Sequence, residues 1–233
     1  MKAVFKREFK SYFSTPVGFI VLAAYYFFLG LYFALIYSSG VPNVTGVMTA
    51  MSSVVVFTMP VLTMRLMSED RRLKVDQALL TAPVSLTSIV MGKFSAALCV
   101  FALGFAPTVI FEIIVACYVK VNVAAFLYAL LGVLLFGSAL ISIGMFISSL
   151  TESPVVSAIM TLVVNIIVLY MSSFASMVKT EFISKIFEKA AFITAFESFG
   201  ETVFSVKDVI YFASIAAAFL FLSVRSLDKR RWA

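Results

Sequence analysis

The sequence has no histidine, and only 13% of its 233 residues are charged. Without histidine, catalytic pairs that rely on an imidazole base are excluded, and a metal site of the usual kind is disfavoured. Cys99 and Cys117 lie singly within apolar runs, so they form no metal-binding cluster, and nothing in the pattern supports a disulfide between them. We therefore expect no metal and no cofactor in this chain.

A phosphate-binding loop of the pattern G-x-x-x-x-G-K-[ST] is also missing. Gly92-Lys93 has no glycine at the required upstream position and is followed by Phe94. The ten glycines stand singly and form no nucleotide cradle. We therefore expect that the chain does not hydrolyse ATP and is not an enzyme.

Apolar residues, in contrast, are abundant: they make up 62% of the chain and include 25 phenylalanines. Soluble domains have about 45–50% apolar residues, and a globule of this size could not bury so much apolar surface. Both a soluble and a disordered protein are therefore excluded. The formal charge of +6 indicates the positive-inside rule of membrane proteins rather than nucleic-acid binding, so lipids are expected as partners.

Six apolar runs are long enough to cross a membrane as helices, which need about 20 residues. The first follows a basic segment but is longer than a signal-peptide core, and no clear cleavage site follows it. We therefore interpret it as a retained span and predict one all-α, polytopic transmembrane domain over residues 1–233. The six spans are predicted at 17–38, 47–67, 88–118, 123–149, 154–177 and 208–225.

The distribution of Lys and Arg predicts the orientation. One side of the predicted bundle carries Lys2, Lys6, Arg7, Lys10, Arg65, Arg71, Arg72, Lys74, Lys93, Arg225, Lys229, Arg230 and Arg231. The other side carries only Lys120, Lys179, Lys185, Lys189 and Lys207. This imbalance places both termini in the cytoplasm, which an even number of spans also requires. The expected location is the plasma (inner) membrane.

Residues 1–14 have the pattern of an amphipathic helix lying at the membrane surface. The aromatic side consists of Phe5, Phe9, Tyr12 and Phe13, and the cationic side of Lys6, Arg7 and Lys10. Phe5, Phe9 and Phe13 are the expected interfacial anchors. The alternative is a disordered basic tail.

The connection 68–87 predicts a cytoplasmic helix over residues 69–81. Ser68 is a suitable N-cap, and Glu69 and Asp70 suit a helix start, while Pro83 ends the helix near Thr81. Leucines recur every seven residues on one side and apolar residues also occupy the other side. One side can therefore pack on the spans and the other on a partner, although an ordinary solvated loop helix is the alternative.

One further connection, one intramembrane proline and two intramembrane polar residues complete the prediction. Residues 178–207 have helical apolar spacing and predict two short amphipathic helices at the outer interface. Pro107 is expected to kink the third span. Glu112, in the same span, is either a pathway or gate residue or a carboxylate near the surface. Asn165, in the fifth span, is a candidate pathway residue, with helix packing as the favoured role.

The run Ser68-Glu69-Asp70-Arg71-Arg72, followed by Asp76-Gln77-Ala78-Leu79-Leu80-Thr81-Ala82-Pro83-Val84-Ser85, resembles the signature of type-2 ABC exporter permeases. The relevant features are an acidic and double-arginine element, a second acidic residue, a Leu-Leu pair and a proline stop. The six-span layout fits as well. Within the family, the chain resembles the gliding-motility and copper-enzyme-maturation groups, although Lys74 and Val75 replace the Gly and Thr found in many members.

The resemblance implies that helix 69–81 is a coupling helix docking on an ABC ATPase subunit, which would carry ATP and Mg²⁺. The implied coupling residues are Glu69, Asp70, Arg71, Arg72, Asp76, Leu79, Leu80 and Pro83, with Glu152 in the turn 151–154 as a second contact. It also implies that residues 1–14 form a connecting helix. A second permease copy, identical or related, would complete the pathway.

The expected function is therefore the permease subunit of an ATP-driven exporter. A secondary transporter would place paired ionisable residues at mid-membrane, where only Glu112 comes near. A membrane-embedded enzyme is disfavoured by the missing histidine and by the lack of an intramembrane dyad. A non-transporting membrane scaffold remains an alternative.

Overall fold

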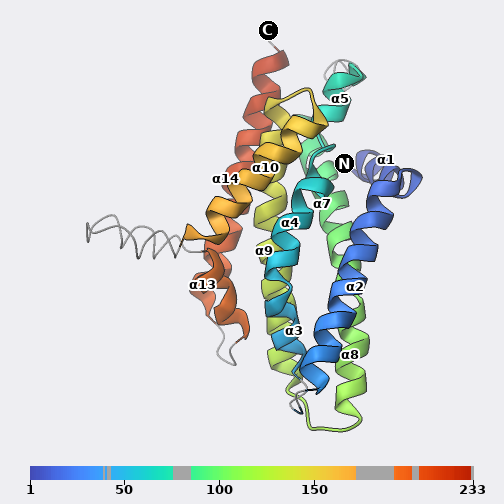
Figure 1. Ribbon diagram of the computed structural model, residues 1–233. Helices are drawn as coiled ribbons and strands as arrows, with labels where there is room; N and C mark the ends of the chain where they lie inside the picture. Colours follow the sequence, from blue (N-terminus) through green and yellow to red (C-terminus); the bar gives the residue numbers. More distant parts are fainter. Residues whose placement is uncertain (39, 41–42, 76–84, 172–191, 201–204, 232–233) are drawn as a thin grey trace.

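The computed structural model describes residues 1–38, 40, 43–75, 85–171, 192–200 and 205–231. Across these ranges the chain is helical and contains no β-strand, which confirms the all-α fold class. Long helices run side by side as a bundle (Figure 1). In chain order, the elements are α1 (Lys2–Ser14), α2 (Pro16–Ser38), α3 (Val44–Ala50), α4 (Ser52–Thr63), α5 (Ser68–Arg72), α7 (Leu86–Gly104), α8 (Pro107–Ala116), α9 (Val123–Leu150), α10 (Pro154–Leu169), α13 (Phe192–Glu197), the 3₁₀ helix η1 (Ser198–Gly200) and α14 (Val206–Arg231).

Local sequence signals set several helix starts. Prolines occupy the first position of α2, α8 and α10. A backbone N–H at this position makes no hydrogen bond within the helix, so proline, which lacks the N–H, costs nothing there. Asn43 and Asn122 cap α3 and α9, since each side-chain oxygen accepts a backbone N–H three residues on, at 3.2 and 3.3 Å. These caps satisfy amides that a helix start otherwise leaves free.

Helix α9 forms the centre of the bundle. It packs against α14, α7, α4 and α10, and 72% of its most apolar window is buried. Small residues on α9 allow these neighbours to approach closely, as expected where no water drives helices together. A group of aromatic rings packs near the middle of α9, where Phe136 contacts the rings of Phe196 and Phe212.

Four helical segments are long and apolar enough to cross a membrane: Pro16–Ser38, Leu86–Ala116, Val123–Leu150 and Val206–Lys229. The bent pair α3 and α4 adds a fifth if it counts as one span. The predicted fifth span, 154–177, is represented by α10, a shorter apolar helix of 16 residues, and its remaining residues lie largely outside the described ranges. The described residues thus bear out a polytopic protein, while the predicted fifth span, and with it the total of six spans, stays a prediction.

Two of the predicted spans are interrupted. Helices α7 and α8 are separated at Phe105–Ala106, directly before Pro107, in accord with the expected disturbance. The second predicted span, 47–67, differs from a single straight helix because α3 and the following helix meet at 52°. Pro60 lies inside α4, where it removes one backbone hydrogen bond.

The predicted continuous helix over residues 69–81 requires correction. Helix α5 covers only Ser68–Arg72, and the chain turns at Leu73 and Lys74. Lys74 has φ of +56°, a left-handed conformation that interrupts an α-helix. The regular spacing of the leucines in this segment favoured a continuous helix and gave no indication of the turn. Asp76, Leu79, Leu80 and Pro83 lie outside the described residues.

The connection predicted as two outer helices is described only over residues 192–200 and from 205 onward. There α13 and η1 bury Phe192, Phe196 and Phe199 against α9 and α14. An aromatic face packed on the bundle is consistent with short amphipathic helices. The first of the two predicted helices, with Ile183 and Ile186, lies outside the described residues.

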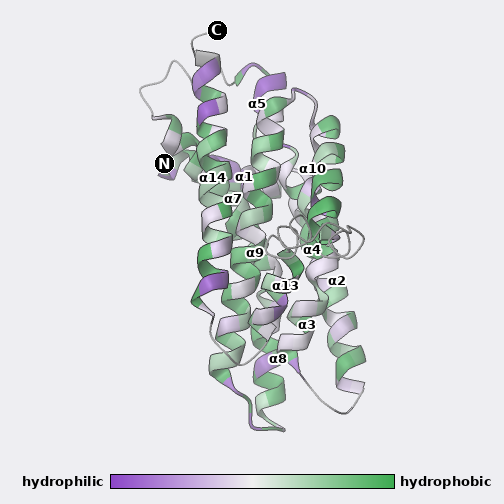
Figure 2. Cartoon of the chain, turned by 90° about the vertical axis from the view of Figure 1, so that its left-hand side faces the viewer, coloured by the Kyte–Doolittle hydropathy of each residue, from purple (hydrophilic) through white to green (hydrophobic). Residues whose placement is uncertain are grey.

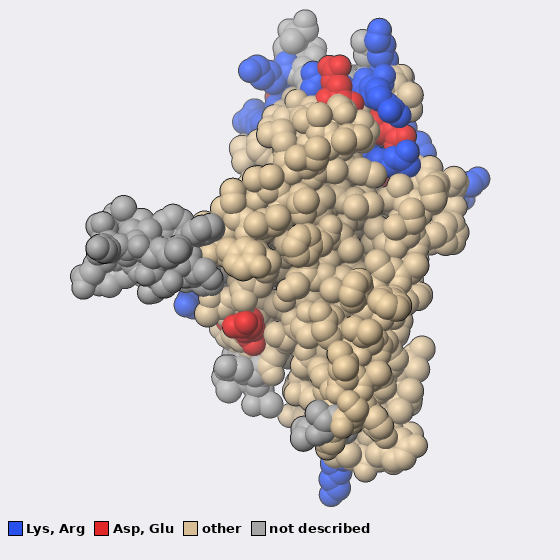
Figure 3. Space-filling view, viewed as in Figure 1, with Lys and Arg blue, Asp and Glu red and all other residues tan. Residues whose placement is uncertain are grey.

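Charged side chains gather at one end of the bundle. In Figure 3, Lys, Arg, Asp and Glu cluster at the upper end, and few charged side chains appear on the broad surface below. Figure 2 shows the same contrast along the ribbon, with hydrophilic residues near α5 and the C-terminal part of α14. We call this end, which contains α1, α5, the start of α7 and the turn 151–153, the charged end.

Candidate functional site

The charged end is organised around a buried lysine. Lys93, in the second turn of α7, has a side chain that is only 1% exposed. Its ammonium nitrogen lies 2.7 Å from Asp70 Oδ2 on α5 and 3.0 Å from Glu8 Oε1 on α1. One side chain therefore joins three elements that are distant in the sequence.

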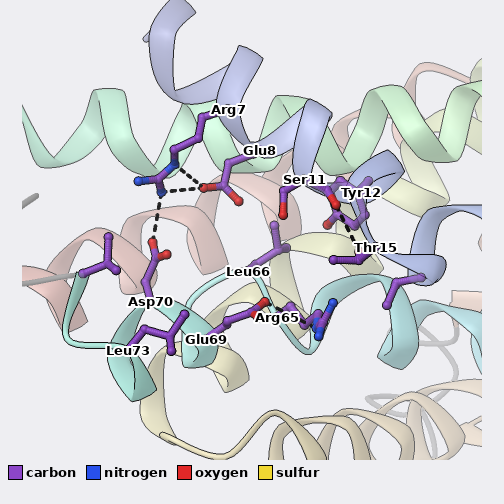
Figure 4. A pocket seen from close by; sticks show the side chains of 12 residues that line it. Arg7, Glu8, Ser11, Tyr12, Thr15, Arg65, Leu66, Glu69, Asp70 and Leu73 are labelled. Atoms are coloured by element: carbon purple, nitrogen blue, oxygen red, sulfur yellow. Dashed lines mark hydrogen bonds and ion pairs between the residues drawn. The ribbon is translucent and has the colours of Figure 1, made fainter.

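Arg7 completes this group, which we call the Lys93 cluster (Arg7, Glu8, Asp70 and Lys93). Its guanidinium Nη2 lies 2.6 Å from Glu8 Oε1 and 3.3 Å from Asp70 Oδ2 (Figure 4). Burial lowers the pKa of Arg7, but the hydrogen bonds and negative charges of Glu8 and Asp70 raise it by more. Two cations and two carboxylates compensate each other, which a buried charge requires.

Side chains of α1 pack on two neighbouring helices and so bring the residues of the Lys93 cluster together. Val4 of α1 packs directly on Gly92, where a Cβ atom would lie 3.0 Å from the Val4 Cβ. Tyr12 is buried, and its hydroxyl donates a hydrogen bond of 2.8 Å to the carbonyl of Leu62 near the end of α4. Burial, together with the charge of Glu8, raises the pKa of Tyr12, so the phenol remains a donor. Helix α1 is thus fixed to both α7 and α4.

The start of α5 is stabilised from α9 rather than by its own residues. The backbone N–H groups of Met67 and Ser68 both donate to Ser148 Oγ, at 3.1 and 3.0 Å. The Ser148 hydroxyl in turn donates to the Met64 carbonyl at 3.1 Å. The expectation that Ser68 is the N-cap is therefore wrong: Met67 holds that position, and the Ser68 hydroxyl donates to Met64.

A second contact joins α5 to the turn between α9 and α10. Arg71 Nη2 lies 2.9 Å from Glu152 Oε1, and Arg71 Nη1 donates a 3.1 Å hydrogen bond to the Leu150 carbonyl. The two segments predicted to form separate contacts with a partner are therefore connected to each other. Glu69 pairs along its own chain with Arg65, at 3.3 Å.

A polar cavity of about 250 Å³ lies between α1 and the α4–α5 corner. Figure 4 shows Arg7, Glu8, Glu69 and Asp70 at its walls, with Leu66 and Leu73 beside them. Both charge signs line the cavity. Among the described residues, no group of acidic and thiol side chains is arranged to hold a metal ion.

The structure brings some of the predicted coupling residues together and separates others. Asp70 and Arg71 point into contacts with other elements, whereas Arg72 is exposed. Glu152 joins this set through Arg71. Residues 76–83 lie outside the described ranges.

The two intramembrane candidates lie apart from the charged end. Glu112 is half-exposed on α8, a helix that lies at the opposite end of the bundle from the charged end (Figure 1). Asn165 is fully buried, and its Nδ2 donates a 3.2 Å hydrogen bond to the Val56 carbonyl of α4. This contact fits the favoured packing role, and the pathway role of both residues stays a prediction.

The predicted aromatic anchors of α1 form a continuous row. Phe5, Phe9 and Phe13 have successive ring centroids 5.8 and 5.2 Å apart, and Phe19 of α2 continues the row at 5.6 Å. All three anchors are half-buried. Tyr12, which the pattern placed on the same side, instead points inward to Leu62.

Sequence reasoning missed Glu8 and the role of Lys93. Glu8 lies among cations that dominate the helical pattern of residues 1–14. Lys93 entered the prediction only beside Gly92 and as one of the cations that indicate the orientation. A lysine two turns into an apolar run is itself a signal, because an ionisable residue there needs a partner, but the identity of that partner depends on tertiary contacts.

These features define a multi-pass membrane protein whose amphipathic N-terminal helix and first polar connection are joined by buried ion pairs. The model of the ABC-2 type transporter family matches residues 1–196, and the chain belongs to that family. It is therefore a membrane permease component of an ABC transporter, and membership implies association with an ABC ATPase. No curated protein matches the chain.

Proposed function

We propose that this chain is the permease subunit of an ATP-driven exporter, and that its charged end faces the cytoplasm and binds the ATPase. Two copies, or this chain and a related permease, would enclose the pathway. ATP hydrolysis would occur on the partner, since this chain has no phosphate-binding loop. The orientation rests on the excess of Lys and Arg at the charged end.

The Lys93 cluster is the observation that carries this proposal. A segment that transmits force from an ATPase must be fixed to the membrane helices, because a loosely attached loop would move without them. Asp70 connects α5 to α7 and α1 through Lys93, and Arg71 connects α5 to the turn 151–153. A push on α5 would therefore reach α1, α7, α9 and α10 together.

The exposed surface of α5 is the proposed docking surface. Arg72 and Leu73 are exposed beside side chains that are held inward. ATP-driven closure of the ATPases would move this surface and shift the bundle between two states. Such a shift requires that the ATP-bound partner binds the two states with different affinity.

The test is co-purification with the ABC ATPase expressed from the same operon or co-expressed with it. Arg72→Glu should reduce the recovered ATPase and the ATP hydrolysis that the permease stimulates, while leaving the melting temperature unchanged because the side chain is exposed. Lys120→Glu is the matched control, as it reverses an exposed charge beyond α8. Equal recovery of the ATPase with both variants would contradict the proposal and favour the non-transporting scaffold.

A further inference from the structure

Helix α10 carries polar side chains on its buried side and apolar ones on its outer side. Ser157, Thr161 and Asn165 recur every four residues, and each is 0% exposed, so they form one stripe facing the bundle. We call these three residues the polar ladder. The opposite side of α10 exposes only large apolar residues such as Ile159 and Val163.

The ladder differs from the other buried hydroxyls of the bundle. Thr63, Ser142 and Ser223 each donate to a carbonyl of their own helix, at 2.9, 2.7 and 2.8 Å. Ser157 Oγ and Thr161 Oγ1 are buried without any hydrogen-bond partner in the described part of the chain. Buried polar groups are nearly always paired, so these two need an explanation.

Only one of the two polar atoms of the Asn165 side chain has a hydrogen-bond partner within the described residues. Its Nδ2 donates to the Val56 carbonyl at 3.2 Å, and this carbonyl is free because Pro60, four residues on in α4, has no N–H to bond it. Its Oδ1 accepts no hydrogen bond within the described residues. The contact between α4 and α10 thus includes a broken backbone hydrogen bond at Val56, and the buried side of α10, which packs on α4 and α9, carries three unpaired side-chain atoms.

The ladder has a defined start and length. Ser157 lies one turn after Pro154, beside the turn that Arg71 and Glu152 connect to α5. Asn165 lies about 12 Å further along the helix axis, at 1.5 Å per residue. The ladder therefore runs from the charged end into the middle part of a bilayer about 30 Å thick.

We propose that α10 separates from α4 along the polar ladder in a second state, which lets water in, and that the ladder is an uncharged hydrogen-bonding lining for cargo. Hydroxyl and amide groups of the ligand would pair with Ser157, Thr161 and Asn165, which offer donors and acceptors but no charge. The passage of cargo rests on the proposed transport function, whereas the entry of water does not. A gap between α4 and α10 that is lined by the polar ladder would bind polar, uncharged groups better than ions.

Thiol reactivity measures the presence of water directly, because N-ethylmaleimide reacts with the thiolate, which hardly forms in an apolar environment. In full-length protein with Cys99 and Cys117 replaced by serine, single cysteines would be placed at Ser157, Thr161 and Asn165. The matched controls are Ser142→Cys, a buried serine with a satisfied hydroxyl, and Val163→Cys, on the outer side of α10. All variants are assayed in membranes with the ATPase present.

The ladder cysteines should react at least about tenfold faster than both controls, given the dependence of rate on thiolate fraction. Equal rates at ladder and control positions, with and without ATP, would overturn the proposal. Loss of ATPase binding with fast ladder labelling would instead refute only the transport function. The two failures are therefore distinguishable.

A second variant separates a functional ladder from a structural one. Thr161→Val keeps the shape but removes a hydroxyl that has no partner, so the melting temperature should stay the same or rise. When Thr161→Val is combined with Ser157→Cys, the N-ethylmaleimide labelling of the cysteine should slow, because the gap between α4 and α10 becomes less polar. A fall in the melting temperature with unchanged labelling would mean that the hydroxyl is structural and would contradict the proposal.

Discussion

The ammonium group of Lys93 lies 2.7 Å from a carboxylate oxygen of Asp70 and joins α5 to the start of α7. Glu8 binds the same ammonium group from α1 at 3.0 Å. The polar connection that follows α4 is thereby attached to the membrane helices at a buried position. This attachment is what the proposed transfer of force requires.

Removal of the buried cation should destabilise the protein strongly. Lys93→Met leaves Asp70 and Glu8 with only Arg7, which is 43% exposed, as a shared partner, and breaking a buried ion pair in this way costs about 3–5 kcal/mol. The free energy of unfolding, measured by denaturant titration in detergent, checks this. Lys10→Met, at an exposed position of α1, is the control and should change little.

Removal of a neighbouring carboxylate should then offset part of the stability that Lys93→Met loses. In Lys93→Met with Asp70→Asn, Arg7 and Glu8 still form a pair, so the double variant should lose less stability than the two single variants added together. A double-mutant cycle measures this interaction directly. Strict additivity would show that Lys93 and Asp70 are not coupled.

The fold was largely readable from the sequence because lipid leaves long helices as the main solution. The apolar runs near residues 17–38 and 123–149 became α2 and α9 almost residue for residue. The break between α3 and α4 was missed, although Ser52 and Ser53 lie directly at the 52° bend, because the run 47–67 as a whole is apolar and long enough for one span. The end of α5 at Arg72 was missed because leucine spacing continues past the turn at Lys74.

The candidate site was only partly readable. Asp70 and Arg71 stood out through the family motif and local charge. Glu152 was also expected as a contact with the partner, but its pairing with Arg71 and the pairing of Lys93 with Asp70 were not predicted, because the packing of α7 and α9 brings these residues to α5. Pairing between distant segments depends on tertiary geometry, and a single sequence contains no direct record of it.

Tyr12 should contribute a measurable share of stability. Tyr12→Phe removes the donor to the buried Leu62 carbonyl, which should cost about 1–3 kcal/mol. Tyr26→Phe is the matched control, because Tyr26, which is 45% exposed, donates an equivalent hydrogen bond of 3.2 Å to the Leu103 carbonyl. If both variants unfold at the same denaturant concentration, α1 is not anchored through Tyr12.

Close packing of α9 on α4 predicts opposite effects for two glycine substitutions. A Cβ at Gly144 would lie 2.3 Å from Thr63 Oγ1, so Gly144→Ala should destabilise by about 1–3 kcal/mol. Around Gly30 nothing lies within 4 Å of an added Cβ, so Gly30→Ala should stabilise α2 by about 0.5–1 kcal/mol. Melting temperatures in detergent distinguish the two, and destabilisation by Gly30→Ala would contradict the packing described.

Glu152→Gln should separate coupling from stability. The Glu152 side chain is 65% exposed, so loss of its ion pair with Arg71 should cost less than about 1 kcal/mol. The ATP hydrolysis stimulated by the permease should nevertheless fall, because α5 loses its charged contact with the turn before α10. Unchanged stimulation would remove that turn from the proposed transmission route.

The most direct test of the central claim is a photo-crosslink from Leu73, which is 59% exposed at the end of α5. A photoreactive amino acid at this position, in intact cells, should form an adduct with the ABC ATPase, identified by a peptide from its phosphate-binding loop domain. The same amino acid at Tyr118, an exposed position near the opposite end, should form none. Labelling of position 73 by a membrane-impermeant reagent from outside the cell, with no ATPase adduct, would contradict the account.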